Sequence, residues 1–173
     1  MDLRLFQQIN KLSGRISPVD NLMIFISNQS RYVYAFILLV LLLKNRRNNR
    51  IALETGSSVL LGLVVQFFIK LFYNKPRPFV KRRVGILIPS KTDSSFPSKH
   101  TILAFAASTT ILMFHRKLGT IMMLMSALTG FSRIWVGHHY PSDIIGSALL
   151  GSLTSFVTRI FSFSKFGNKP EAN

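Results

Sequence analysis

The chain has 173 residues, the length of a single domain, and 48% of them are apolar. Its mean hydropathy is positive, which favours a membrane protein over a soluble globular one. The formal net charge is +16, from 22 lysines and arginines against 6 acidic residues. The chain has no cysteine, which excludes disulfides and thiolate metal sites.

The strong positive charge requires anionic partners. The lysines and arginines alternate with long apolar segments and do not form one basic face, as nucleic-acid recognition would require. This pattern favours anionic membrane lipids and a phosphate-bearing substrate as partners, and it disfavours nucleic acid. The first residues, Met1 to Arg4, lack the layout of a cleaved signal peptide, so we expect the helices themselves to direct membrane insertion.

The chain begins with a predicted amphipathic helix. Residues 2–13 carry apolar side chains at helical spacing but are too few to span a membrane, so we expect this helix to lie at the interface. Five membrane-spanning helices are predicted after it, each close to the ~20 residues that cross the hydrocarbon core. They cover about residues 21–43, 51–72, 98–114, 118–135 and 141–163.

The predicted architecture is therefore an all-α, polytopic membrane helical bundle that forms one domain over residues 1–173. A polar tail, about residues 164–173, is expected to be flexible. The first span has an unusual polar run in its middle, Ser27-Asn28-Gln29-Ser30-Arg31. We expect the outer part of that helix to pack on protein or to lie near lipid headgroups.

Three polar clusters lie at the ends of apolar segments between residues 70 and 143. They are Lys70 with Arg77-Pro78, the run Pro97-Ser98-Lys99-His100, and Ser132-Arg133 with His139 and Asp143. Because successive spans cross in alternating directions, helix counting places all three clusters on the same side of the membrane. The sequence therefore predicts that they form one site.

The third cluster contains a candidate nucleophile. A neutral imidazole at His139 can attack phosphorus and form a phosphohistidine. Asp143 follows four residues later, in the first turn of a helix that begins at Pro141, and we expect its carboxylate to orient the imidazole. A simpler role for Asp143 is to complement the helix dipole.

The second cluster contains a candidate general acid. His100 follows Ser98, a predicted N-cap, so it lies in the first turn of a helix whose free N–H groups favour a phosphate. Ser98 could equally be a cap without substrate contact, and His100 an interfacial histidine. We expect no catalytic role for His115, which lies beside headgroup-facing cations, or for His138, which points away from His139.

Three cations complete the predicted site. Lys70, Arg77 and Arg133 match the donors that bind phosphate, although lysines and arginines near a membrane boundary also snorkel to the headgroups. Only Asp93 and Asp143 lie near the histidines, so the sequence offers no carboxylate cluster for magnesium and no zinc site. We therefore expect metal-independent chemistry without a cofactor.

The three clusters resemble the motifs of the type 2 phosphatidic acid phosphatase superfamily: Lys-x6-Arg-Pro, Pro-Ser-Gly-His and Ser-Arg-x5-His-x3-Asp. Lys99 replaces the glycine, and every other fixed position matches. The segments 75–79, 95–100 and 130–141 further resemble the bacitracin-resistance type of undecaprenyl pyrophosphate phosphatase. That resemblance implies hydrolysis of undecaprenyl pyrophosphate to undecaprenyl phosphate and inorganic phosphate on the outer face of the bacterial plasma membrane, recycling the cell-wall carrier lipid.

The resemblance also implies roles for individual residues. It assigns His139 as nucleophile, His100 as acid and Asp143 as orienting group. The implied phosphate ligands are Lys70, Arg77, Ser98 and Arg133. In place of the glycine, Lys99 adds a further cation for phosphate. We also expect the other cations of residues 75–99 to favour a pyrophosphate substrate: Lys75, Lys81, Arg82, Arg83 and Lys91.

Other functions remain open at this point. The motifs contact phosphate and not the lipid tail, so a phosphatidylglycerol phosphate or phosphatidic acid phosphatase fits them as well. A non-catalytic lipid-binding protein would not need both histidines and the aspartate, and the five spans disfavour a soluble haloperoxidase. Lysines and arginines lie on both sides of the membrane, so their raw count does not decide the orientation by the positive-inside rule. If the cations of the clusters are set aside as substrate-binding, the basic loop of residues 44–50, opposite the clusters, favours an outward-facing site.

Overall fold

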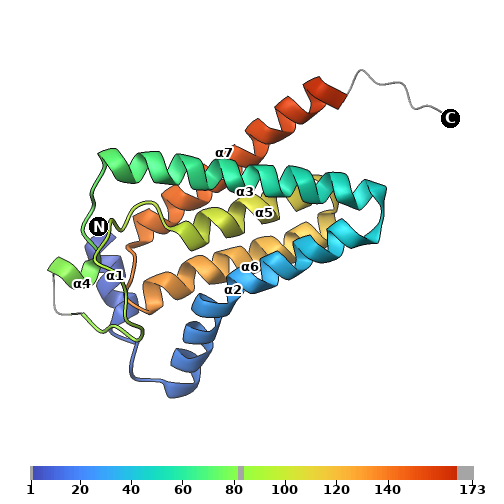
Figure 1. Ribbon diagram of the computed structural model, residues 1–173. Helices are drawn as coiled ribbons and strands as arrows, with labels where there is room; N and C mark the ends of the chain where they lie inside the picture. The colour runs from blue at the N-terminus through green and yellow to red at the C-terminus, as the bar shows by residue number, and fades with distance from the viewer. Residues whose placement is uncertain (1, 82–83, 167–173) are drawn as a thin grey trace.

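The computed structural model describes residues 2–81 and 84–166, and these residues form seven helices without a strand (Figure 1). The helices are α1 (Asp2–Asn10), α2 (Ser17–Lys44), α3 (Arg46–Phe72), α4 (Pro78–Lys81), α5 (Lys99–Phe114), α6 (Arg116–Trp135) and α7 (Pro141–Phe166). All five predicted spans are helices within a few residues of the expected bounds. The helix α7 continues to Phe166, so the beginning of the predicted tail is helical. Residues 167–173 of that tail lie outside the described residues.

The long helices make this a multi-pass membrane protein. Three helices, α2, α3 and α7, are long and apolar enough to cross a membrane. Large apolar side chains on them face outward, including Phe36, Phe67 and Phe161. The apolar helix α5 is shorter, with 16 residues, and α6 has 20 residues. Helix α5 packs against α2, α3 and α7, and α6 packs against α2 and α7.

Helix α5 forms the centre of the bundle because its side chains are small and apolar. It packs on α3, α6 and α7, and Ala104, Ala106 and Ala107 are among its buried residues. The facing position on α7 is Gly151. A Cβ at Gly151 would lie 2.6 Å from the carbonyl oxygen of Ile102, so the close approach of the two helices requires glycine there.

Hydroxyl groups tie the helices together inside the bundle. Ser58 of α3 and Ser155 of α7 are hydrogen-bonded at 2.9 Å, and the Tyr34 hydroxyl of α2 lies 2.7 Å from Ser126 Oγ of α6. Such bonds contribute on average about 0.6 kcal/mol each in membrane bundles. They fix the relative positions of helices that carry the polar clusters at one end.

That end of the bundle is covered by α1, α4 and the loop between α4 and α5 (Figure 1). The apolar face of α1 packs on the protein: Phe6 is fully buried, and its ring centroid lies 5.6 Å from that of Tyr140. Asn10 anchors the loop, since its amide donates to the Gly85 carbonyl at 2.9 Å and accepts from the Gly85 N–H at 3.1 Å. The short helix α4, which lies between the predicted spans 51–72 and 98–114, was not predicted.

Candidate active site

The three polar clusters meet at one cavity of about 510 Å³, at the end of the bundle that α1 and the α4–α5 loop cover. Its wall includes both candidate catalytic histidines, His100 and His139, and four predicted phosphate ligands: Lys70, Arg77, Lys99 and Arg133. The expected convergence of the three clusters is thus observed. Two other predicted site residues, Ser98 and Asp143, are fully buried and do not line the cavity.

The geometry of His139 leaves one ring nitrogen available. Gly137, with φ +86°, makes the turn between α6 and His139. His139 Nδ1–H donates to the Ser95 carbonyl at 2.7 Å, so the lone pair is on Nε2, which lies 3.4 Å from Arg77 Nη1. Burial and the charges of Arg133 and Arg77 hold the pKa of His139 well below its ordinary value. The imidazole is therefore neutral at pH 7, the form that can act as a nucleophile.

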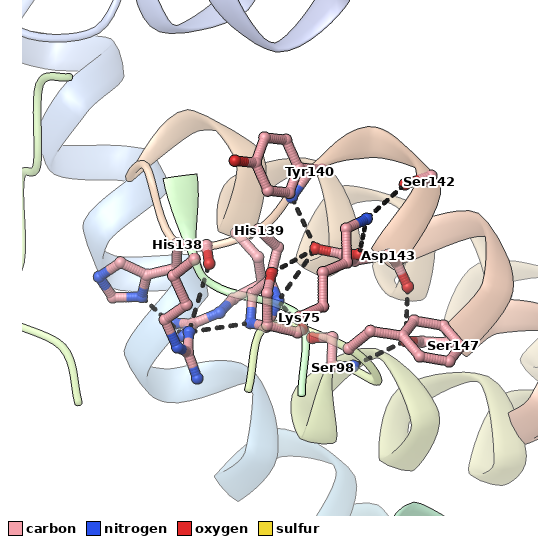
Figure 2. A network of polar contacts seen from close by, with 12 residues as sticks. Lys75, Ser98, His138, His139, Tyr140, Ser142, Asp143 and Ser147 are labelled. Atoms are coloured by element: carbon pink, nitrogen blue, oxygen red, sulfur yellow. Dashed lines mark hydrogen bonds and ion pairs between the residues drawn. The ribbon is translucent and has the colours of Figure 1, made fainter. Parts of the chain in front are cut away.

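Asp143 supports His139 mainly through Ser95. The carboxylate Oδ2 lies 4.0 Å from His139 Nδ1, farther than the Ser95 carbonyl. The same Oδ2 accepts a short hydrogen bond from the Ser95 hydroxyl. It also accepts one of 2.9 Å from the Tyr140 N–H (Figure 2). Ser95, which sequence reasoning did not single out as a site residue, therefore connects the carboxylate to the imidazole.

Lys75 binds the other oxygen of Asp143. Lys75 Nζ lies 2.6 Å from Asp143 Oδ1 and 3.0 Å from Ser142 Oγ (Figure 2). It also lies 3.6 Å from Asp2 Oδ2. Burial lowers the pKa of Lys75, but the hydrogen bond and charge of Asp143 and the charge of Asp2 outweigh burial and raise it. The expectation that Lys75 binds the pyrophosphate was wrong. Lys75 does not line the cavity and instead binds the carboxylate of Asp143.

Asp93 forms ion pairs with two of the predicted phosphate ligands, Lys70 and Arg77. Its carboxylate lies 2.7 Å from Lys70 Nζ and 2.8 Å from Arg77 Nη2. Burial raises the pKa of Asp93, but its hydrogen bonds to Lys70 and Arg77 and their charges outweigh burial and lower it. A carboxylate thus lies where the donors of Lys70 and Arg77 converge, which indicates that these donors are arranged for an anion.

Arg133 is held in place by two neighbouring side chains. Its Nη1 donates to Ser27 Oγ of α2 at 2.5 Å, and its Nη2 donates to His138 Nδ1 at 2.7 Å. Arg133 Nε is buried and has no hydrogen-bond partner in the described parts of the chain. The role of Arg133 as a phosphate ligand stays a prediction.

His138 has a structural function that sequence reasoning missed. It points away from His139, as expected (Figure 2). Its Nε2–H donates to the Ile88 carbonyl at 2.8 Å, which leaves Nδ1 to accept from Arg133. Burial and the charge of Arg133 lower the pKa of His138 to about 4, so it is neutral and can accept that bond. His138 therefore orients Arg133 and anchors the loop.

The start of α5 differs in detail from the expected cap. Ser98 is the N-cap residue, as predicted, but its hydroxyl makes no capping bond and instead accepts from Thr101 Oγ1 at 3.1 Å. The Ser98 N–H donates to Ser147 Oγ at 2.7 Å, and Ser147 in turn donates to the Asp143 carbonyl. These contacts join the second and third clusters. The role of Ser98 as a phosphate ligand stays a prediction.

The donors around the cavity suit an anion and not a metal ion. Within residues 2–81 and 84–166, no group of three or more histidine, cysteine or acidic side chains lies close enough to hold a metal. Asp93 is the one acid among the described residues of the cavity wall, and it is already paired with two cations. A neutral imidazole at His139 beside converging cations is the arrangement that phosphoryl transfer through a histidine requires.

Comparisons with known proteins agree with a site for phosphoryl transfer. A sequence model of the PAP2 superfamily matches residues 51–166. The chain is 42% identical to the undecaprenyl-diphosphatase BcrC of Bacillus subtilis, over 95% of this chain and 84% of that protein. It is 31% identical to an undecaprenyl-diphosphatase of Sulfolobus acidocaldarius, over 91% of this chain and 76% of that protein.

Two crystal structures have a similar fold. LpxE of Aquifex aeolicus matches with a TM-score of 0.81 and 27% identity, over 92% of this chain and 94% of that one. The PAP2-type phosphatidylglycerolphosphate phosphatase of Bacillus subtilis matches with a TM-score of 0.66 and 21% identity, over 97% of this chain and 89% of that one.

Proposed function

This chain belongs to the PAP2 superfamily of phosphatases, and we propose that it hydrolyses undecaprenyl diphosphate to undecaprenyl phosphate and inorganic phosphate through a phosphohistidine at His139. The single observation that supports this most strongly is the convergence of His139, His100 and the cations of all three clusters on one cavity. The substrate is inferred from the relatives that carry the name undecaprenyl-diphosphatase, at 42% and 31% identity.

In the proposed first step, His139 Nε2 attacks the terminal phosphorus. The N–P bond forms while the bond from that phosphorus to the bridging oxygen breaks, and undecaprenyl phosphate leaves. His100 donates its proton to the leaving oxygen. A bound diphosphate brings negative charge beside His100, which favours the protonated imidazole that this step needs. Arg77 and Arg133 neutralise the charge on the transferred phosphoryl group.

In the second step, water hydrolyses the phosphohistidine. His100, now neutral, accepts a proton from water as the water oxygen attacks phosphorus and the N–P bond breaks. Inorganic phosphate is released and both histidines return to their initial states. Throughout, the Ser95 carbonyl holds His139 Nδ1–H, so the same nitrogen always carries the nucleophilic lone pair.

We place the protein in the bacterial plasma membrane with the cavity on the outer face. The support for this orientation is the basic segment from Lys44 to Arg50, which joins α2 and α3 at the end of the bundle opposite the cavity. Loops rich in lysine and arginine are found preferentially on the cytoplasmic side. Anionic lipids are the expected neighbours of this segment.

The alternative substrates have weaker support. The match to a phosphatidylglycerolphosphate phosphatase, at 21% identity, extends to the fold alone. Intact candidate catalytic residues disfavour a lipid-binding protein without activity. No feature of the cavity wall favours phosphatidic acid.

A panel of lipid substrates tests the proposal. The purified protein in detergent should release phosphate from undecaprenyl diphosphate with a higher kcat/KM than from phosphatidylglycerol phosphate or phosphatidic acid. It should do so in excess EDTA, because the predicted chemistry uses cationic side chains in place of a metal. A preference for either of the other two lipids, or an absolute requirement for a divalent ion in the enzyme, would overturn the proposal.

A further inference from the structure

The polar run in the middle of α2 has no function in the mechanism described so far. Polar and ionisable residues within a spanning helix are costly and are usually functional. Two members of the run, Asn28 and Arg31, line the cavity, and a third, Ser27, holds Arg133 at 2.5 Å. Positions three and four residues apart share one face of a helix, so α2 presents this polar face to the site.

The charge balance of the cavity distinguishes Arg31 from Lys70 and Arg77, which are both paired with Asp93. Among the described residues, four cations of the cavity wall make no salt bridge: Arg31, Lys91, Lys99 and Arg133. Of these, Arg133 is held by Ser27 and His138. The contacts of Arg31 are neutral, since its Nη2 donates to the Tyr32 hydroxyl at 3.0 Å and its guanidinium lies 4.7 Å from the centre of that ring. Its charge is therefore available to an anion.

The position of Arg31 relative to the two histidines indicates which phosphate it would bind. Lys99 directly precedes His100 at the start of α5. Arg31 lines a small neighbouring cavity together with Leu103 of α5, which lies one turn after Lys99 and His100, so Arg31 lies beside the start of α5. Arg77 Nη1, by contrast, lies 3.4 Å from His139 Nε2. Arg31 and Lys99 thus lie toward the proposed acid, while Arg77 lies toward the proposed nucleophile.

Phosphoryl transfer requires the attacking and leaving groups to lie roughly in line, on opposite sides of the transferred phosphorus. With His139 attacking, the bridging oxygen and the second phosphate of a diphosphate must lie on the side of His100, which protonates that oxygen. A monophosphate lipid has only an ester oxygen and a carbon chain there. The cations on the His100 side therefore meet a negative charge only when the substrate is a diphosphate.

We infer that Arg31, with Asn28 one turn before it on α2 and Lys99 at the start of α5, forms the subsite for the second phosphate, which stays on the lipid. Arg31 thereby sets the preference for diphosphate over monophosphate lipids. This inference rests on the diphosphatase function proposed above. Negative charge grows on the second phosphate as the bridging bond breaks, so Arg31 stabilises the transition state more than the bound substrate and acts on kcat as well as KM.

The test uses two probes with the same tail, farnesyl diphosphate and farnesyl monophosphate, in detergent. In Arg31→Gln, kcat/KM for the diphosphate should fall at least about tenfold, the effect expected for a lost hydrogen bond between charged groups. For the monophosphate it should fall less than about threefold. Arg31→Lys, which keeps the charge, should recover most of the diphosphate activity. Arg15→Gln is the matched control, because Arg15 is an exposed cation at the same end that does not line the cavity.

The outcomes separate this inference from the proposed function. If wild-type protein prefers the diphosphate and Arg31→Gln lowers both activities by the same factor, the subsite is wrong and the proposed function stands. The subsite is also wrong if Arg15→Gln reproduces the selective loss, because a general surface charge then explains it. If wild-type protein does not prefer the diphosphate over the monophosphate, the proposed substrate fails and the inference fails with it.

Discussion

Lys75 and Asp143 form an ion pair of 2.6 Å although they are 68 residues apart in the chain. Asp143 is fully buried, and Lys75 is the cation that neutralises it among the described residues. The pair lies outside the cavity and is connected to His139 through Ser95. Lys75 lies between Lys70 and Arg77 in the sequence, so the segment that carries the first cluster also stabilises the carboxylate of the third.

Substitution of Lys75 should therefore impair catalysis without changing the substrate preference. Lys75→Met leaves a buried carboxylate without its counter-charge, which should lower the free energy of unfolding by about 2 kcal/mol, less than for a fully buried pair. We expect kcat to fall about tenfold for diphosphate and monophosphate lipids alike, because the effect passes through Asp143. Lys81, also expected to favour a pyrophosphate, does not line the cavity and has no described ion pair, so Lys81→Met is the control. A loss confined to the diphosphate would return Lys75 to the substrate-binding role that the sequence suggested.

Asp143→Asn should lower kcat by about 10³–10⁴, as in other systems where a carboxylate orients a catalytic histidine. Ser95→Ala should have a smaller effect, since the Ser95 carbonyl that holds His139 remains and only the hydroxyl bond to Asp143 is lost. Steady-state phosphate release measures both. Wild-type rates in Asp143→Asn would remove the orienting role of this residue.

Stability should fall as the pH is lowered below the ordinary histidine pKa of about 6.5. The folded-state pKa of His139 is lowered well below that value, and that of His138 is lowered to about 4. Between these values and 6.5 the unfolded chain binds protons that the folded chain does not. Each of the two histidines therefore removes about 1.4 kcal/mol of stability per pH unit over this range. Thermal unfolding in detergent between pH 7.5 and 4.5 measures the slope, which should become shallower in His139→Asn; an unchanged slope would contradict the assignment.

Asp93 should compete with substrate for Lys70 and Arg77. Vanadate, which adopts the five-coordinate geometry of phosphoryl transfer, should inhibit the enzyme because the site is complementary to that geometry. In Asp93→Asn the two cations lose their internal carboxylate, so vanadate should bind several-fold more tightly. Inhibition constants at fixed ionic strength measure this. Weaker inhibition in the variant would mean that Asp93 positions the cations more than it competes for them.

The sequence predicted the helices and the cluster convergence well, because both depend on local patterns. Apolar segments of spanning length predicted five helices. Pro141 indicated the start of α7, because proline suits the first helical turn. Alternation of spans then placed His100 and His139 at the same end. The four-residue helix α4 was missed because so short an element has no periodic pattern.

The remaining site contacts could not be predicted, because they join residues distant in sequence without a local signal. Lys75 reads as one more cation of a basic loop, and only the folded chain brings it to Asp143. The Ser95 carbonyl that holds His139 is a backbone group, which sequence patterns do not reveal. The polar run of α2 was visible, but its orientation toward the cavity depends on how α2 packs against α6. Arg82 and Arg83, expected to favour a pyrophosphate, lie outside the described residues.

The most direct test of the central claim is to trap the covalent intermediate. Wild-type protein in detergent is mixed with undecaprenyl diphosphate labelled at its terminal phosphate and quenched on the millisecond timescale. Label should be bound to the protein in the form of an acid-labile, alkali-stable phosphohistidine, and it should be absent from His139→Asn, which should also release no phosphate while remaining folded. Turnover by wild-type protein without labelled protein, or equal labelling of His139→Asn, would contradict His139 as the nucleophile.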